Sequence, residues 1–86
     1  MHYTAFTSDD PIQHLSRALS ELQRIGFLMR EVTVTSGGAS AIVDTDQNSP
    51  ANIRILYKIA GTSQPETYAK RLAGLHGVHH VESGAA

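Results

Sequence analysis

The chain has 86 residues and a formal net charge of −1 at neutral pH, with the histidines counted as neutral. This length predicts one domain, residues 1–86, with one modest core, because so short a chain buries only about 60% of its unfolded surface. There is no cysteine, which excludes disulfides, cysteine metal sites and a thiol nucleophile.

The rest of the composition indicates that neither a nucleic acid nor a membrane is a partner of the chain. The seven Lys and Arg residues form no run, and only five residues are Tyr or Phe, so we expect no nucleic-acid interface. No apolar segment approaches the length of a membrane span, and the N-terminus lacks a signal-peptide pattern. We therefore expect a cytoplasmic protein that does not enter a membrane.

The first part of the chain predicts a strand followed by a helix. Residues 2–7 alternate in polarity as a short strand does. Asp10 and Pro11 mark the start of a helix, with Gln13 at the capping-box position, and Gly26 marks its end. An apolar stripe with helical spacing lies between these limits and consists of Ile12, Leu15, Leu19 and Leu22.

The middle of the chain begins with a second predicted strand, residues 27–35, rich in β-branched and apolar side chains. Met29 and Val32 have opposite parity in it, so we expect a bulge between them. Residues 36–51 are rich in turn formers and long for a hairpin connection. We expect either a loop or a longer irregular hairpin, with residues 41–43 extending one strand.

The third predicted strand, residues 52–60, has the most regular alternation and one strongly apolar face. A second capping box at residues 63–66 predicts the start of another helix, and Gly77 predicts its end. The apolar stripe of this helix consists of Tyr68, Leu72 and Leu75.

Residues 78–82 predict the last strand, and we expect residues 83–86 to be a frayed tail. The order strand, helix, strand, strand, helix, strand predicts two interleaved βαβ units with right-handed crossovers. The expected fold is therefore α+β and ferredoxin-like (βαββαβ), with a four-stranded antiparallel sheet and both helices on one face. Leu56 and Ala60 lie on the mixed face of the third strand, so we expect the open face or an edge of the sheet to meet a partner. A homodimer would bury more apolar surface than this small core does alone, and so would stabilise the fold.

Two stretches, residues 9–34 and 64–82, resemble the small subunit of acetohydroxyacid (acetolactate) synthase, a regulatory protein built on an ACT domain. The first stretch carries Leu15-Ser16-Arg17, Leu22, Arg24, Gly26-Phe27 and Thr33-Val34 at the spacing of that family. The second stretch carries Lys70, Leu72, Leu75, Val78, Val81 and Glu82.

The resemblance implies a non-catalytic subunit with no cofactor and no metal of its own. In that family the large subunit is the transferase, which joins two 2-ketoacids in branched-chain amino-acid biosynthesis with thiamine diphosphate, Mg²⁺ and usually FAD. The small subunit stabilises the large one and often confers feedback inhibition by valine. The implied partners are therefore a second copy, a large catalytic subunit and an amino-acid effector.

The resemblance also implies an effector site at the loop between the first strand and the first helix. The candidate effector-binding residues at the corresponding positions are Asp10, Ile12, Gln13, Ser16 and Leu28. This loop has no glycine through which backbone N–H groups could approach a carboxylate, and Asp9 and Asp10 would repel one. Leu28 stands where the family usually has Asn. The loop therefore argues against valine and leaves another effector open.

Other hypotheses remain. One is an ACT-like sensing or interaction domain of another system, similar to the cytoplasmic C-terminal domain of MgtC-type membrane proteins. Another is a small metal-handling ferredoxin-like domain that uses His76, His79 and His80, although neighbouring strand residues point to opposite faces. An enzyme using the loop carboxylates Asp44 and Asp46 has the least support, since nothing in their setting would shift a pKa.

A further feature of the sequence is a set of scattered arginines. Arg17, Arg24 and Arg30 are either solvated or part of a partner surface.

Overall fold

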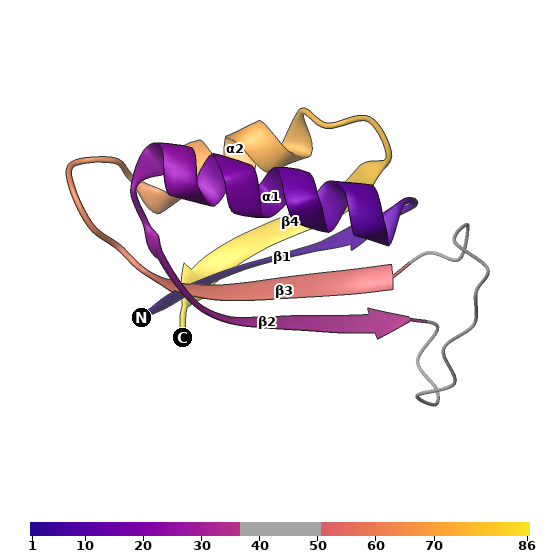
Figure 1. The fold of residues 1–86 in the computed structure, drawn as a ribbon, viewed down its shortest axis with the longest axis horizontal. Helices are drawn as coiled ribbons and strands as arrows, with labels where there is room; N and C mark the ends of the chain where they lie inside the picture. Colours follow the sequence, from indigo (N-terminus) through magenta and orange to yellow (C-terminus); the bar gives the residue numbers. More distant parts are fainter. Residues whose placement is uncertain (37–50) are drawn as a thin grey trace.

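The computed structural model describes residues 1–36 and 51–86, which form a four-stranded sheet with both helices on one face (Figure 1). The elements are β1 (His2–Ser8), α1 (Pro11–Ile25), β2 (Leu28–Ser36), β3 (Ala51–Lys58), α2 (Pro65–Ala73) and β4 (Val78–Ala85). All neighbouring strands are antiparallel, in the order β2-β3-β1-β4. The predicted ferredoxin-like βαββαβ fold is confirmed. The strand expected at residues 41–43 and the carboxylates at 44 and 46 lie outside the described residues.

Helix α1 begins and ends where its capping residues predict. The Asp10 carboxylate accepts a hydrogen bond from the Gln13 backbone N–H at 3.5 Å, and Pro11 occupies the first turn. Gly26 adopts a left-handed conformation with φ of 96°, and its N–H donates to the carbonyl oxygens of Leu22 and Gln23. Glycine adopts this conformation at the least steric cost, which explains why the helix ends there.

The buried side of α1 differs from the predicted apolar stripe. Ala18 and Leu22 are fully buried, but Ile12 is 68% exposed, so its assignment to the core was wrong. His14 and Glu21 are buried instead, although both are polar. Helix α2 packs beside α1 (Figure 1) and contacts Glu21, whereas His14 contacts Ser8 of β1 and the turn before β4.

Helix α2 departs from its prediction at both ends. Its N-cap is Gln64, which makes no side-chain capping hydrogen bond, so the capping box expected at residues 63–66 is not formed. Pro65 does occupy the first turn. The helix ends at Ala73 rather than near Gly77, because the chain must turn back toward the start of β4.

Both edge strands are irregular. The pairing of β2 with β3 shifts register between Met29 and Glu31, which confirms the predicted bulge. The pairing of β4 with β1 shifts between Ala5 and Thr7, and His80 in β4 has a positive φ of 54°. This second irregularity explains how Val78 and Val81, which have opposite parity, both contact the core.

The C-terminal residues belong to the sheet, contrary to the expected frayed tail. Ala85 pairs with His2, and the Ala86 N–H donates to the Met1 carbonyl oxygen at 3.0 Å. The two ends of the chain therefore lie together at one end of the sheet (Figure 1).

The core lies between the helices and one sheet face. Phe27 stacks on Tyr57 with ring centroids 5.3 Å apart, and Tyr68 meets Tyr57 edge-on at 5.5 Å. Leu22 and Leu72 of the predicted helix stripes share one interior with Ile53 and Ile55, which lie on the apolar face predicted for the third strand. The buried apolar residues of this core are Phe6, Ala18, Leu22, Phe27, Ile53, Ile55, Tyr57, Tyr68, Leu72 and Val78. Neither helix of the described residues is long and apolar enough to cross a membrane.

Candidate functional site

The loop between β1 and α1 borders a surface depression of about 540 Å³, the loop depression. It lies where this loop meets the turn that leads from α2 to β4. Its lining comes from both segments and from α1: Asp9, Asp10, Gln13, His14, Arg17, Leu75, His76 and Gly77. Two of the five predicted effector residues, Asp10 and Gln13, therefore line one surface feature.

The other three predicted effector residues lie elsewhere. Ile12 and Ser16 are exposed on α1 and do not line the loop depression. Leu28 begins β2, just beyond the opposite end of α1, which is about 22 Å long at 1.5 Å per residue. Within one copy of the chain these five residues do not converge on a single ligand.

A buried serine and histidine fix one side of the loop depression. His14 Nε2–H donates to the His76 carbonyl oxygen at 2.8 Å, since a carbonyl can only accept. In the neutral ring Nδ1 is then the acceptor, and it receives the Ser8 hydroxyl proton. Ser8 Oγ also accepts the Asp10 N–H at 3.1 Å.

This pair resembles a nucleophile and its base, but Ser8 is completely buried. Its contacts hold the end of β1 and the turn before β4 together. We therefore assign Ser8 and His14 a structural role. Sequence patterns did not reveal the pair, because only the fold places the Ser8 hydroxyl against the His14 ring.

The histidines near the C-terminus do not converge on one point. His79 Nε2 lies 3.2 Å from a carboxylate oxygen of Asp9, and both side chains are more than half exposed. The His79 and His80 ring centroids are 6.4 Å apart. In residues 1–36 and 51–86, no three His, Asp or Glu side chains are placed to share a metal ion.

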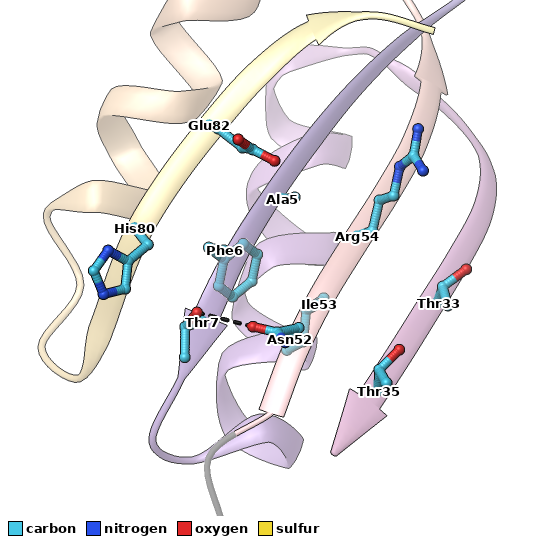
Figure 2. A pocket seen from close by; sticks show the side chains of 10 residues that line it. All are labelled: Ala5, Phe6, Thr7, Thr33, Thr35, Asn52, Ile53, Arg54, His80 and Glu82. Atoms are coloured by element: carbon cyan, nitrogen blue, oxygen red, sulfur yellow. Dashed lines mark hydrogen bonds between the residues drawn. The ribbon is translucent and has the colours of Figure 1, made fainter. Parts of the chain in front are cut away.

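The sheet face opposite the helices has a shallow groove of about 480 Å³, the open-face groove (Figure 2). Ala5 forms part of its floor, with Arg54 of β3 and Glu82 of β4 in register on either side. Arg54 lies over the Tyr3 ring at 4.7 Å from its centroid. The alternation of β3 predicts which residues face this way, but only the strand order brings Arg54 and Glu82 to the same row.

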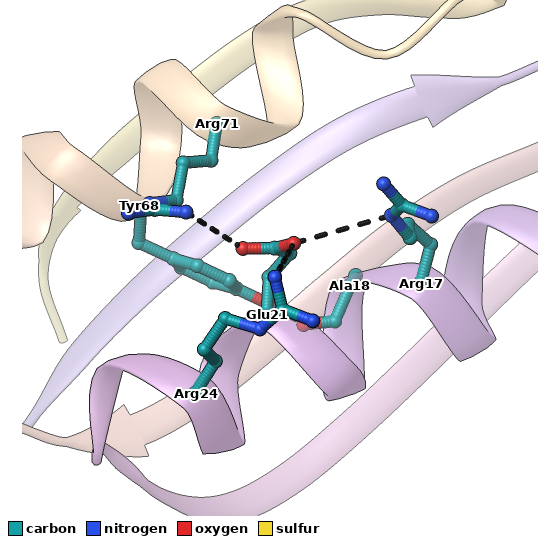
Figure 3. A network of polar contacts seen from close by, with 6 residues as sticks. All are labelled: Arg17, Ala18, Glu21, Arg24, Tyr68 and Arg71. Carbon is teal, nitrogen blue, oxygen red and sulfur yellow. Dashed lines mark hydrogen bonds and ion pairs between the residues drawn. The ribbon is translucent and has the colours of Figure 1, made fainter.

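A polar network joins the two helices on the other side of the molecule (Figure 3). Glu21, whose side chain is only 10% exposed, receives a hydrogen bond from Arg71 at 3.2 Å. Arg24 and Arg17 approach the other carboxylate oxygen at 3.9 and 4.0 Å. We call Arg17, Arg24 and Arg71 around Glu21 the arginine cluster.

A buried hydrogen bond lies beneath the arginine cluster. The Tyr68 hydroxyl donates to the Ala18 carbonyl oxygen at 2.8 Å. Burial, followed by the charges of Tyr57 and Glu21, raises the pKa of Tyr68 well above its ordinary value. The phenol therefore keeps its proton and remains a donor. The predicted apolar stripe of α1 does not include Glu21, so the sequence pattern missed this network.

No protein-family model matches the chain, and a search of curated proteins finds no significant relative. The grounds for a function are therefore the fold, the three surface features described above, and the resemblance carried by residues 9–34 and 64–82.

Proposed function

We propose that this chain is a regulatory or stabilising subunit of a thiamine-diphosphate-dependent acetohydroxyacid synthase, acting in the cytoplasm in branched-chain amino-acid biosynthesis. The chain would bind the large catalytic subunit and contribute contacts rather than chemistry. The observation that carries the proposal is the placement of both helices on one face of an antiparallel βαββαβ sheet. This is the ACT-domain arrangement that the resemblance implies.

The residues that carry the resemblance make contacts that are consistent with it. Leu22 and Phe27 are almost fully buried, and Gly26 ends α1 between them. Leu72 and Val78, in the second matching stretch, belong to the same core. These positions suit any helix packed on such a sheet, so they support the fold more strongly than the partner.

We also propose that the chain forms a homodimer through the edge strand β2. Nine residues of β2 lie at the edge of the sheet, and Leu28, Met29 and Val34 are about half exposed there. A long edge strand with exposed apolar side chains promotes uncontrolled association unless something pairs with it, and within residues 1–36 and 51–86 no strand pairs with the outer edge of β2. A second copy related by a two-fold axis would pair the same edge with itself and close the assembly.

The proposed effector site is the loop depression, where the resemblance puts an amino acid and which Asp10 and Gln13 line. Asp9 and Arg17 line it as well, so any ligand there meets two carboxylates and one guanidinium, a negative balance of charge. We do not propose valine, because its carboxylate would meet these negative charges.

Co-expression with the large subunit of an acetohydroxyacid synthase from the same genome tests the function. We expect the tagged chain to co-purify with the large subunit, and acetolactate formation to be faster or longer-lived with the chain than without it. An unrelated ferredoxin-like domain of similar length is the matched control. A large subunit that neither binds the chain nor changes in activity or stability would refute the proposal.

A further inference from the structure

The arginine cluster carries more positive charge than its one carboxylate requires (Figure 3). Arg71 alone pairs with Glu21 through a hydrogen bond of 3.2 Å, which satisfies the need of a buried carboxylate for a partner. Arg17 and Arg24 stand at 4.0 and 3.9 Å, with side chains 62% and 73% exposed. Exposed pairs with such long contacts contribute little to folding, so the fold does not explain why both are arginine.

The two outer arginines lie near the Glu21 carboxylate and have further N–H donors. Each contacts Glu21 through one nitrogen, Nε of Arg17 and Nη1 of Arg24, and each guanidinium has further N–H groups. In residues 1–36 and 51–86 neither contacts another carboxylate. A planar guanidinium with further N–H groups suits the two oxygens of a carboxylate.

The net charge of the two helices also favours a partner that carries carboxylates. The two helices carry four cationic and two acidic side chains: Arg17, Arg24, Lys70 and Arg71 against Glu21 and Glu66. The whole chain nevertheless has a net charge of −1. The positive charge is therefore concentrated on the helical layer, and an acidic partner surface complements it.

The aromatic side chains argue against a nucleic acid as the partner. Proteins that bind single strands combine basic groups with exposed aromatic rings on which bases stack. The two helices have two aromatic rings, those of His14 and Tyr68, and both are buried. The arginine cluster thus offers charge without a stacking surface, which favours protein carboxylates.

We propose that the arginine cluster binds an acidic surface segment of the large subunit, one that presents at least two carboxylates to Arg17 and Arg24. This inference rests on the proposed function, because it names the surface through which the chain meets that partner. The cluster lies on the helical layer, whereas the β2 edge remains available to a second copy.

The test compares two double charge reversals. Arg17→Glu/Arg24→Glu changes the cluster, and Arg54→Glu/Lys58→Glu makes the same change of charge on the opposite sheet face. We expect the first variant to bind the large subunit about tenfold more weakly or worse, and the second to change binding by less than about twofold. The salt dependence of binding should also become shallower in the first variant only. Circular dichroism and thermal unfolding check that both variants fold.

A neutral variant covers the case in which the charge reversal fails to fold. Arg17→Gln/Arg24→Gln leaves Arg71 on Glu21, and we expect it to weaken binding by about threefold or more.

The outcomes separate this inference from the proposed function. If the unaltered chain does not bind the large subunit, the proposed function fails and this inference fails with it. If the chain binds and the cluster variants bind equally well, only this inference fails. It also fails if Arg54→Glu/Lys58→Glu alone weakens the complex, which would place the partner on the open sheet face. Binding of a labelled single-stranded oligonucleotide that is lost in Arg17→Glu/Arg24→Glu, with the protein complex intact, would reassign the cluster to nucleic acid.

Discussion

The Tyr68 hydroxyl on α2 donates a hydrogen bond of 2.8 Å to the Ala18 carbonyl oxygen on α1, and both residues are fully buried. This bond joins the two helices directly beneath the arginine cluster. Because burial raises the pKa of Tyr68, the neutral phenol is favoured in the folded state over the unfolded one. The burial of this phenol therefore makes stability depend on alkaline pH.

Tyr68→Phe should lower the free energy of unfolding by about 1 kcal/mol at neutral pH, through the lost hydrogen bond. Above pH ~10 the unfolded tyrosine ionises while the folded one does not, so the unaltered chain loses up to about 1.4 kcal/mol per pH unit from this residue. The variant lacks this term, so its deficit should shrink as pH rises. Urea unfolding across neutral and alkaline pH measures both effects. Parallel decline of the two proteins would contradict the assignment.

Because Ser8 and His14 form a buried pair, removing the Ser8 hydroxyl should cost more stability than removing the Thr7 hydroxyl on the same strand. Ser8→Ala removes the donor to His14 Nδ1 and the acceptor of the Asp10 N–H, and unpaired buried groups of this kind cost about 1–3 kcal/mol. Thr7→Ala, on the same strand, removes only the exposed bond to Asn52 and should cost about 0.5 kcal/mol. Chemical denaturation of both variants measures the difference, and equal losses would remove the structural role of Ser8.

Gly77 should tolerate a methyl group less well than Gly61. Both have positive φ, 89° and 77°, so alanine is strained at either position by about 1 kcal/mol. At Gly77 the added Cβ would also lie 3.0 Å from His14 Cε1, whereas at Gly61 it would meet nothing within 4 Å. Gly77→Ala should therefore cost at least about 1 kcal/mol more than Gly61→Ala in the same unfolding assay. Equal costs would mean that the turn before β4 can shift away from His14 to make room for the added Cβ.

The packing of the core can be tested by comparing Ile55, in β3, with Ile59, which lies just beyond the end of β3. Ile55 is fully buried, and Ile55→Ala should cost about 2–5 kcal/mol, a large fraction of the stability of so small a domain. Ile59 is partly exposed just beyond β3, and Ile59→Ala should stay within about 0.5 kcal/mol. Thermal unfolding of the two variants provides the comparison. A large loss at Ile59 would show that this residue is covered in solution, for example by another copy.

The proposed dimer predicts that a charge on the β2 edge separates the copies. Val34→Lys puts a cation on the apolar part of this edge, and we expect the chain to become monomeric, because edge lysines block strand pairing. Ile12→Lys, at an exposed apolar position on α1, should leave the dimer unchanged. Light scattering coupled to size-exclusion chromatography reads the mass. An unaltered chain that is already monomeric at high concentration would refute the dimer.

Local signals predicted most of the fold because each acts within a few residues. Asp10 and Gly26 limit α1 through backbone conformations and capping bonds that need no distant partner. The alternation of β3 likewise depends only on residues within that strand. The same is true of the parity change between Met29 and Val32, which predicted the bulge in β2. The second capping box failed because Gln64, rather than Ser63, occupies the N-cap position of α2.

The candidate sites were less predictable, since they combine residues far apart in the chain. Asp10 and Gln13 were found at the loop depression because the resemblance points to that loop. His14 meets the His76 carbonyl, and Arg54 lies on Tyr3, only because α2, β3 and β1 are arranged as they are. Nothing in the local pattern around any of these residues specifies such contacts.

The sequence by itself determined the order of the elements, the ends of α1 and the apolar side of β3, because hydrophobic period and backbone preference are properties of neighbouring residues. The tertiary structure decided which polar groups became buried. Glu21 belongs to the arginine cluster because Arg71, fifty residues away, packs against it from α2. The C-terminal residues became part of β4 because β1 supplied hydrogen-bond partners that no local pattern could reveal.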